Sequence, residues 1–447
     1  MPVLVGHAPA RRDDREQDTS RAAVRSTPAL PRLVALLVAS LVALFFSGVA
    51  RAGDWPQILG PSRSGRAADD ERLADAWPAK GPPVAWKREV GRGYAGVVVA
   101  DGRAFLFHRR GDEEVLEALD PATGAPLWTD AHATTFRPQV GGGDGPLATP
   151  TVAGDTVVSY GAQGVLTVND TATGKRLWQR ATHAEHGAQE GYFGAGSSPI
   201  VAAGRVIVNV GGTRGVEGQG GGIVAYDLRT GRPEWSATKE PASYASPVAL
   251  SRDGVERILF VTRYQCILVD PADGTVRWQF PFGMRGPTVN AAAPALVGAD
   301  RLLVTASYGI GSVLARHDDT AVETLWKGDE TLASQYCTPV VIGDHAYALD
   351  GREDGPPGDL VCLDLATGRA AWREESFGYG SLVVADGKLV ILRNDGTVVL
   401  ARASPDRYRE LARHRPLGVG SRAQPALAGG RLYVRDESSL VCLELAE

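Results

Sequence analysis

Apolar and polar positions repeat in a regular pattern along most of the chain. Short apolar runs, each led by a small residue and a proline, are followed by a turn and a second run, as in TPTVAGDTVV around Pro150 and TPVVIGDHAYAL around Pro339. Runs of this length, bounded by Gly and Asp, predict β-hairpins. Two equivalent runs carry Val97 and Leu382 in place of the proline. The mean spacing of about 47 residues indicates a repeat architecture.

A second motif, Asp-x-x-Thr-Gly-x-x-x-Trp or a variant of it, follows most hairpins. In VNDTATGKRLW it places Asp170, Gly174 and Trp178. The Asp-to-Gly stretch predicts a turn between a third and a fourth strand, and the tryptophan lies on the fourth. We expect these tryptophans to fill the gaps between neighbouring repeats. The equivalent positions are Trp86, Trp128, Trp178, Trp235, Trp278, Trp326 and Trp372.

Each repeat therefore contains four strands, called A to D here in chain order. One such unit cannot bury both of its faces, but units stacked radially form the blades of a propeller. Eight A–B hairpins are present, yet the last repeat ends after strand C at LVCLELAE, and the missing strand D matches PVAWKREV around Trp86. The sequence predicts an all-β, eight-bladed propeller of four-stranded antiparallel blades over residues 84–447, its last blade closed by the N-terminal strand.

The first 83 residues differ from the repeats. Arginines precede an uncharged apolar run over residues 33–49, and Ala50-Arg51-Ala52 follows it. This order predicts a secretory signal peptide over residues 1–52 with a long n-region, although an uncleaved anchor stays open. Residues 53–83, rich in Gly, Pro and charge, are expected to form an arm packed on the propeller edge through Trp55 and Trp77.

Composition narrows the class of protein and its location. Hydrophobic residues make up 44 % and charged residues 22 %, which excludes a disordered chain and a membrane bundle. The net charge of −5 argues against nucleic-acid binding. We expect an exported, periplasmic or envelope-associated monomer with no membrane span after cleavage. No cysteine stands directly after the apolar run, so we do not expect a lipoprotein. The four cysteines are predicted to be buried thiols in strands: Cys266, Cys337, Cys362 and Cys442.

The Asp-Thr-Gly-Trp copies, the Pro-led strands and the split last blade together resemble the pyrroloquinoline quinone (PQQ) repeat propellers. That family includes quinoprotein alcohol dehydrogenases and the propeller component of the outer-membrane protein assembly machinery. The resemblance implies the fold and leaves two functions, redox catalysis and scaffolding. The enzymes pair the quinone with Ca²⁺, and many carry two adjacent cysteines, whereas this chain has no adjacent pair and no C-x-x-C-H motif. We therefore expect a non-catalytic scaffold with no cofactor and no metal site.

Candidate binding residues lie in the D–A and B–C loops, which share one end of a propeller. They are Arg137, Asp144, Tyr192, Tyr244, Asn290, Tyr336, Tyr379, Arg422 and Asp436. Function concentrates on varied loops over a rigid scaffold, so we expect this face to bind a protein or peptide of the cell envelope. The alternative that such side chains only cap the channel stays open.

Two other functions stay open at this stage. One is a PQQ- and Ca-dependent alcohol dehydrogenase with Asp144 or Asp436 as base and Asn290 as a metal ligand. The other is binding of a small polar ligand or sugar by the tyrosines. His183-x-x-His186 is expected to be a solvent-exposed pair rather than a metal site.

Overall fold

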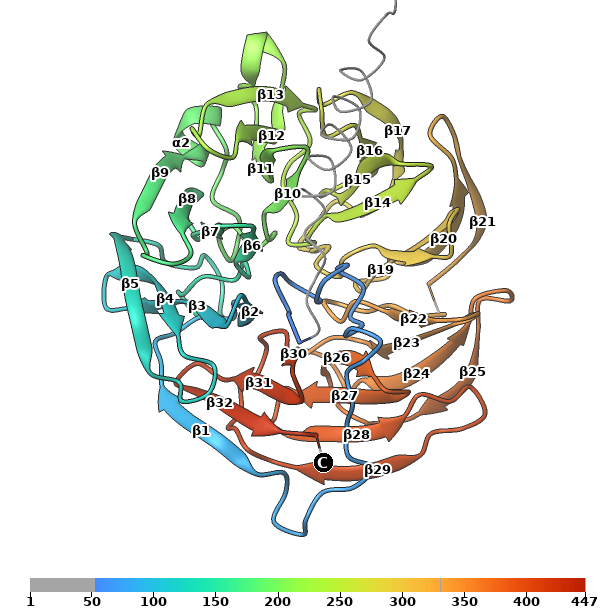
Figure 1. Cartoon of the computed structure of the whole chain (residues 1–447). Helices are drawn as coiled ribbons and strands as arrows, with labels where there is room; N and C mark the ends of the chain where they lie inside the picture. The colour runs from blue at the N-terminus through green and yellow to red at the C-terminus, as the bar shows by residue number, and fades with distance from the viewer. Residues whose placement is uncertain (1–52, 330, 447) are drawn as a thin grey trace, which may run out of the picture. The chain divides into compact units, whose positions relative to one another are not determined.

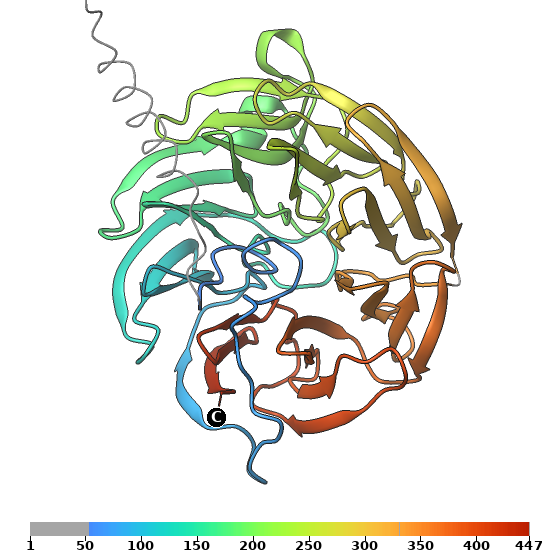
Figure 2. The ribbon, with the colours of Figure 1, turned by 45° about the vertical axis from the view of Figure 1, so that its right-hand side comes forward.

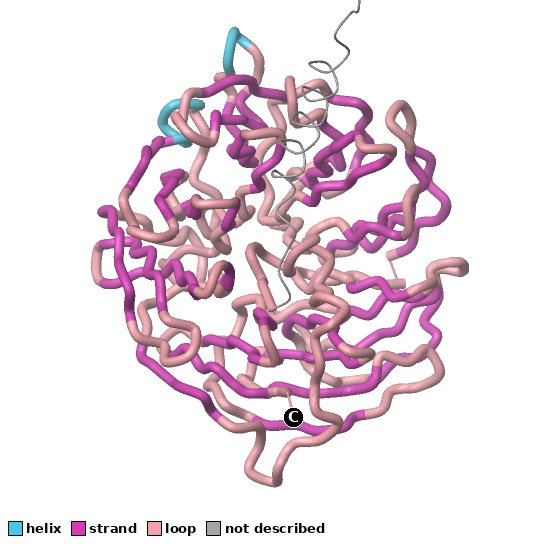
Figure 3. Tube along the Cα trace, viewed as in Figure 1, coloured by secondary structure: helices cyan, strands magenta, loops and turns pink. Residues whose placement is uncertain are grey.

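Eight four-stranded antiparallel sheets surround a central axis as the blades of a propeller (Figure 1). The computed structural model describes residues 53–329 and 331–446, so the predicted signal peptide lies outside the described residues. In the described part of the chain, no helix is long and apolar enough to cross a membrane. Figure 3 shows that strands and loops make up almost the whole of it.

Blades 1 to 4 follow one another in the chain, each with a short strand A nearest the axis. Their strands are β2 (Val98–Ala100), β3 (Arg103–Arg110), β4 (Glu113–Leu119) and β5 (Pro126–Ala133); β6 (Thr151–Ala153), β7 (Thr156–Tyr160), β8 (Val165–Asp170) and β9 (Arg176–Ala181); β10 (Ile200–Ala202), β11 (Arg205–Gly212), β12 (Gly221–Asp227) and β13 (Pro233–Ala237); β14 (Val248–Arg252), β15 (Val255–Val261), β16 (Gln265–Val269) and β17 (Val276–Pro281).

Blades 5 to 7 repeat this order, and blade 8 takes its last strand from the start of the propeller. Their strands are β18 (Ala295–Val297), β19 (Arg301–Ala306), β20 (Gly311–His317) and β21 (Val322–Gly328); β22 (Val340–Ile342), β23 (His345–Asp350), β24 (Asp359–Asp364) and β25 (Arg369–Glu374); β26 (Gly380–Ala385), β27 (Lys388–Arg393), β28 (Val398–Arg402) and β29 (Glu410–His414); β30 (Ala426–Ala428), β31 (Arg431–Arg435), β32 (Ser439–Glu444) and β1 (Val84–Glu89).

The predicted closure of the ring is confirmed. Strand β1 pairs antiparallel with β32, with Trp86 opposite Cys442, so the two ends of the propeller chain share one sheet. Figure 2 shows the light-blue β1 beside the red C-terminal strands. Pairing both ends in one blade removes the open edge that a linear array would leave.

Two details of the prediction need correction. Cys266, Cys362 and Cys442 are buried thiols in strands, but Cys337 lies in the loop before β22, where it is equally buried. His183 and His186 are buried on the short helix α2 (Thr182–His186) rather than exposed, because the helix folds back against blade 3. His186 is bonded at both ring nitrogens, to the Tyr226 hydroxyl at 2.8 Å and the Arg214 carbonyl at 2.7 Å. The only other helical segment described is η1 (Val216–Gly218).

The motif tryptophans join seven of the eight blades to the next one, and strand β29 of blade 7 carries none. The indole of Trp128 donates to the Thr171 carbonyl at 3.0 Å, and that carbonyl belongs to the Asp-Thr-Gly turn of the following blade. Gly174 of the same turn has a φ of +73°, and a Cβ there would lie 2.5 Å from the Trp128 ring. The glycine is thus required both by the turn and by the approach of the indole. Equivalent bonds of 2.8–3.1 Å are made by Trp86, Trp178, Trp235, Trp278, Trp326 and Trp372.

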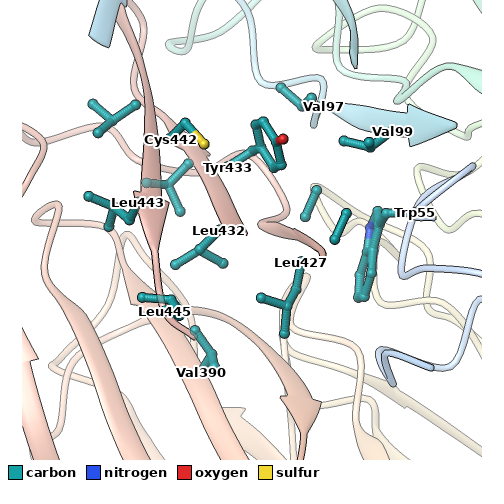
Figure 4. Close-up of a cluster of buried hydrophobic side chains, with 14 of the residues drawn as sticks. Trp55, Val97, Val99, Val390, Leu427, Leu432, Tyr433, Cys442, Leu443 and Leu445 are labelled. Carbon is teal, nitrogen blue, oxygen red and sulfur yellow. The ribbon is translucent and has the colours of Figure 1, made fainter. Parts of the chain in front are cut away.

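The N-terminal arm crosses the end of the central channel instead of lying on the propeller edge. Trp55 is 1 % exposed and bridges Val99 of β2, and it packs among side chains of blades 1 and 8 (Figure 4). The arm reaches one residue or more in every blade: Val99, Val152, Pro199, Pro247, Ala293, Val340, Val384 and Gly429. The eight blades surround a central channel. The N-terminal arm closes this channel at the end where the A–B turns lie.

Arg63 is the most deeply buried charge of the arm. Its guanidinium donates to Gln57 Oε1 at 2.7 Å, to the Pro247 carbonyl at 2.8 Å and to Thr151 Oγ1 at 3.1 Å, and it also reaches the Pro199 carbonyl. Burial lowers the pKa of Arg63 to about 9. Neutral oxygens of three adjacent blades therefore satisfy a charge that is expensive to bury unpaired.

Candidate functional site

The D–A loops converge on a depression at the opposite end of the channel from the A–B turns. We call it the funnel; its volume is about 1020 Å³, part of it open to solvent, and Ile58 of the arm lies in it. The lining residues are Ile58, Tyr94, Gly142, Gly143, Leu147, Thr149, Phe193, Gly196, Tyr244, Ser246, Val289, Ala291, Ala293, Gln335, Tyr336, Thr338, Glu353, Arg422 and Gln424.

The upper wall of the funnel is a periodic ring. One residue from each of seven blades lines it, three positions before the proline or proline-equivalent of strand A: Tyr94, Leu147, Gly196, Tyr244, Ala291, Tyr336 and Arg422. In an extended segment, alternate side chains point to the same side. The eighth equivalent, Tyr379, is buried, and its hydroxyl accepts a hydrogen bond from the Tyr336 backbone N–H at 2.9 Å.

A lower ring lies two residues further along each chain segment, directly before the proline. Thr149 Oγ1 accepts the Gly96 backbone N–H at 2.9 Å, and Ser198 Oγ accepts that of Thr149 at 2.9 Å. The bond from Ser198 to Ser246 Oγ, at 3.0 Å, continues the series. Thr338 Oγ1 likewise accepts the Ala293 backbone N–H at 2.9 Å, so a small hydroxyl residue before four of the six prolines links neighbouring blades.

The funnel has two chemically different sides. Blades 2 to 5 contribute mainly apolar groups, among them Leu147, Phe193 and Val289. Blades 6 and 8 contribute amides and an ion pair, in which Arg422 Nε lies 2.7 Å from Glu353. The Arg422 guanidinium also lies 4.8 Å from the centre of the Tyr94 ring. A mostly apolar cavity with a few fixed polar groups is typical of a ligand site.

The phenols and the guanidinium of the funnel have fixed charge states. Burial, together with a 2.5 Å hydrogen bond to Glu437, raises the pKa of the Tyr94 hydroxyl. Burial also raises the pKa of Tyr244 and Tyr336, so the three phenols are neutral at physiological pH. Burial opposes the charge of Arg422, but Glu353 and Tyr94 outweigh it and raise its pKa. The walls thus carry one compensated ion pair and no free acid or base.

Three of the nine candidate residues, Tyr244, Tyr336 and Arg422, come together in the funnel. Arg137 and Tyr192 do not line it and are solvent-exposed. Tyr379 lies behind Tyr336, with ring centres 4.9 Å apart.

The remaining three candidates hold loops in place. Asp144 lies beside Arg92 at 3.2 Å and Arg109 at 3.5 Å. The Asn290 amide nitrogen donates to three backbone carbonyls, including that of Thr262 at 2.9 Å. Asp436 accepts the backbone N–H groups of Ser438 and Ser439, directly after it, and that of Gly418 in the D–A loop before β30. Burial opposes the charge of Asp436, but these hydrogen bonds keep its pKa below the usual value.

Sequence reasoning missed several funnel residues, among them Tyr94, Glu353 and Gln424. Tyr94 and Gln424 could have been found by counting back from each strand A, because they occupy the same repeat positions as Tyr336 and Thr338. Glu353 comes from the B–C insertion of blade 6, for which the repeat offers no equivalent position. Ile58 comes from the arm, whose path no pattern indicates.

The funnel residues do not fit a Ca²⁺–quinone pair. Calcium requires several oxygen ligands, and the single carboxylate in the wall, Glu353, is paired with Arg422. Asp144, Asn290 and Asp436 point to other partners, as described above. Within residues 53–329 and 331–446, no three His, Cys, Asp or Glu side chains are grouped as a metal ion would need.

Comparison with known proteins agrees with the architecture. The family model described as outer membrane protein assembly factor BamB matches residues 111–374 and 340–447. The chain belongs to this family of PQQ-like β-propellers. Among curated relatives, BamB of Yersinia pestis is 24 % identical over 59 % of this chain and 67 % of its own length. BamB of Burkholderia pseudomallei is 26 % identical over 78 % of this chain and 84 % of its own length.

The family also has similarity to enzymes. A quinohemoprotein alcohol dehydrogenase of Comamonas testosteroni is 31 % identical over 45 % of this chain, which corresponds to only 28 % of that enzyme. The crystal structure of BamB from Moraxella catarrhalis matches with a TM-score of 0.58 and 16 % identity, over 81 % of this chain and 97 % of that one. A europium-containing methanol dehydrogenase matches with a TM-score of 0.64 and 13 % identity, over 86 % and 89 %. These structural matches support the fold alone.

Proposed function

We propose that this protein is an exported, non-catalytic scaffold that binds a protein or peptide of the bacterial cell envelope through its D–A loop face. Membership of the BamB family supports this proposal. The funnel is the observation that carries it, because its walls are preformed, largely apolar and free of an available acid, base or metal-ligand cluster. Such a surface can bind but offers no group to drive a reaction.

Exposed apolar side chains also occur on this face. Four of the ten large ones in the described chain lie in D–A loops, and the other six lie on strands: the four are Val140, Tyr192, Met284 and Val419. Val419 is 75 % exposed, the highest value among the large hydrophobic residues of the described chain. Apolar groups exposed around a rigid cavity are typical of a protein-interaction surface.

Site-specific photo-crosslinking in the producing organism tests the proposal. A benzophenone amino acid replaces Val419 on the D–A face, and the matched control replaces Leu325, an exposed aliphatic residue on outer strand β21. We expect a covalent protein adduct from position 419 and none from position 325. Equal adducts at both positions, or an adduct at 325 alone, would contradict the proposal.

Titration with PQQ and Ca²⁺ tests the competing enzymatic function. A ligand that binds only the folded state raises the melting temperature by mass action. We expect no shift and no bound-quinone absorbance from the full chain at a large ligand excess. A clear shift with a quinone spectrum would overturn the non-catalytic assignment.

A further inference from the structure

Within the proposed binding function, on which this inference rests, the two sides of the funnel indicate what its ligand is. We propose that the funnel receives one large apolar side chain of an extended peptide segment, and that its polar side contacts the main chain of the same segment. The observations behind this proposal are the division of the walls, an unpartnered amide and a run of open backbone at the mouth.

The apolar side is shaped for a ring or a branched aliphatic chain. Phe193 and Tyr244 lie with their ring centres 5.7 Å apart. Leu147 and Val289 also line this region, and Ala291 has the smallest side chain of the upper ring apart from Gly196. Alanine at position 291 is smaller than the tyrosine or arginine that lines the funnel at the same repeat position in blades 1, 4, 6 and 8. Burial of an apolar group against such walls supplies most of the binding energy of a small anchor.

The polar side has one hydrogen-bonding group without a partner. The Gln424 side-chain oxygen is buried and accepts no hydrogen bond from any described residue, although the residue lines the funnel. A buried acceptor that lacks a partner is costly unless a ligand or water satisfies it. A peptide N–H is a suitable donor. The neighbouring Arg422–Glu353 pair is already neutral as a unit, so it favours a polar but uncharged group.

The mouth adds main-chain groups. Gly141, Gly142 and Gly143 are consecutive, and their backbone N–H and C=O groups make no hydrogen bond to any described residue. Gly142 and Gly143 line the funnel, in a loop that passes close to Phe193 and Arg422. Proteins that bind extended peptides use unpaired backbone groups beside an apolar pocket. The main-chain hydrogen bonds provide affinity, and the pocket selects the side chain. A sugar would not require the apolar half of the funnel.

Ligand-observed NMR saturation transfer on the full chain tests this inference. The probes are N-acetyl-phenylalanine methylamide, its alanine analogue and methyl β-glucoside. We expect saturation transfer to the phenyl ring, and about tenfold weaker binding of the alanine analogue because it buries no ring. Stronger transfer to the glucoside than to the phenylalanine probe, or no transfer to the phenylalanine probe, would overturn the inference.

Two substitutions locate the binding. Ala291→Trp fills the apolar half of the funnel and should abolish transfer to the phenyl ring, whereas Ala366→Trp, in an exposed C–D turn, should leave it unchanged. Phe193→Ala, which removes a wall without filling the cavity, should weaken binding and so provides a second test if Ala291→Trp does not fold. Transfer that persists in both funnel variants would overturn the inference. A crosslinked adduct at position 419 would still support the proposed function in that case. The two experiments therefore distinguish failure of this inference from failure of the proposed function.

Discussion

His108 and His183 are buried in positions where solvent cannot stabilise a positive charge. Burial, aided by Arg435, Arg110 and Arg88, lowers the pKa of His108 to about 3. Burial lowers the pKa of His183 to about 4. In the unfolded chain both would titrate near 6.5, so below that pH the unfolded state binds more protons than the folded state. The stability that these neutral histidines confer is complete above pH 6.5 and is lost as the pH falls towards 4.

His183→Gln should therefore reduce the pH dependence of unfolding. Between pH 7 and pH 4.5 the free energy of unfolding of the wild type should fall by about 2.5 kcal/mol through His183 alone, and the variant should lack this component. Urea unfolding at the two pH values, followed by tryptophan fluorescence, measures the difference. An equal fall in the two proteins would show that His183 does not carry the effect.

At the scale of the element, each tryptophan of strand D packs on the turn of the next blade. The recurrence of the tryptophans with the repeat predicted that they pack between blades. It could not identify their partner, since Trp128 and the glycine turn around Gly174 belong to different repeats of the chain. The ring of funnel residues shows the same limit. Tyr94 can be predicted by counting three residues back from Val97, the proline-equivalent position of its repeat. Glu353 cannot be predicted in this way, because it lies in an insertion that the other repeats lack.

Gly174→Ala should damage a blade junction, because the new Cβ clashes with the Trp128 ring. Gly154→Ala is the control, since it introduces the same backbone strain without a clash. Both glycines have positive φ, of +73° and +58°, but a Cβ at Gly154 meets nothing within 4 Å. Gly154→Ala should cost about 1 kcal/mol of stability, and Gly174→Ala about 1–3 kcal/mol more because the Trp128 ring must move. Thermal unfolding and the emission maximum of the tryptophans report the two effects. Equal losses in the two variants would contradict a role for the indole contact.

At the scale of the whole molecule, the eight blades form a ring that the arm closes at one end and the D–A loops leave open at the other. The repeats alone predicted the ring, its blade number and its closure by β1. They did not predict the path of the arm, because residues 53–83 lack any period and their contacts are spread over all eight blades. The arm nevertheless determines the site, since Ile58 lies in the funnel and Arg63 is bonded among the inner strands beneath it.

If the arm holds the ring together, its most buried side chain should matter more than an equally large one nearby. Trp55→Ala removes a ring that is 1 % exposed between blades 1 and 8, and should cost about 3–5 kcal/mol of stability. Trp77→Ala removes the other tryptophan of the arm, which is only partly buried, and should cost less than half as much. Because Trp55 bridges β2 and packs beside β30 (Figure 4), Trp55→Ala should also speed amide hydrogen exchange in β2 and β30, and Trp77→Ala should not. Equal destabilisation by the two variants, or unchanged exchange in β2 and β30 of Trp55→Ala, would mean that the arm covers the ring without holding it closed.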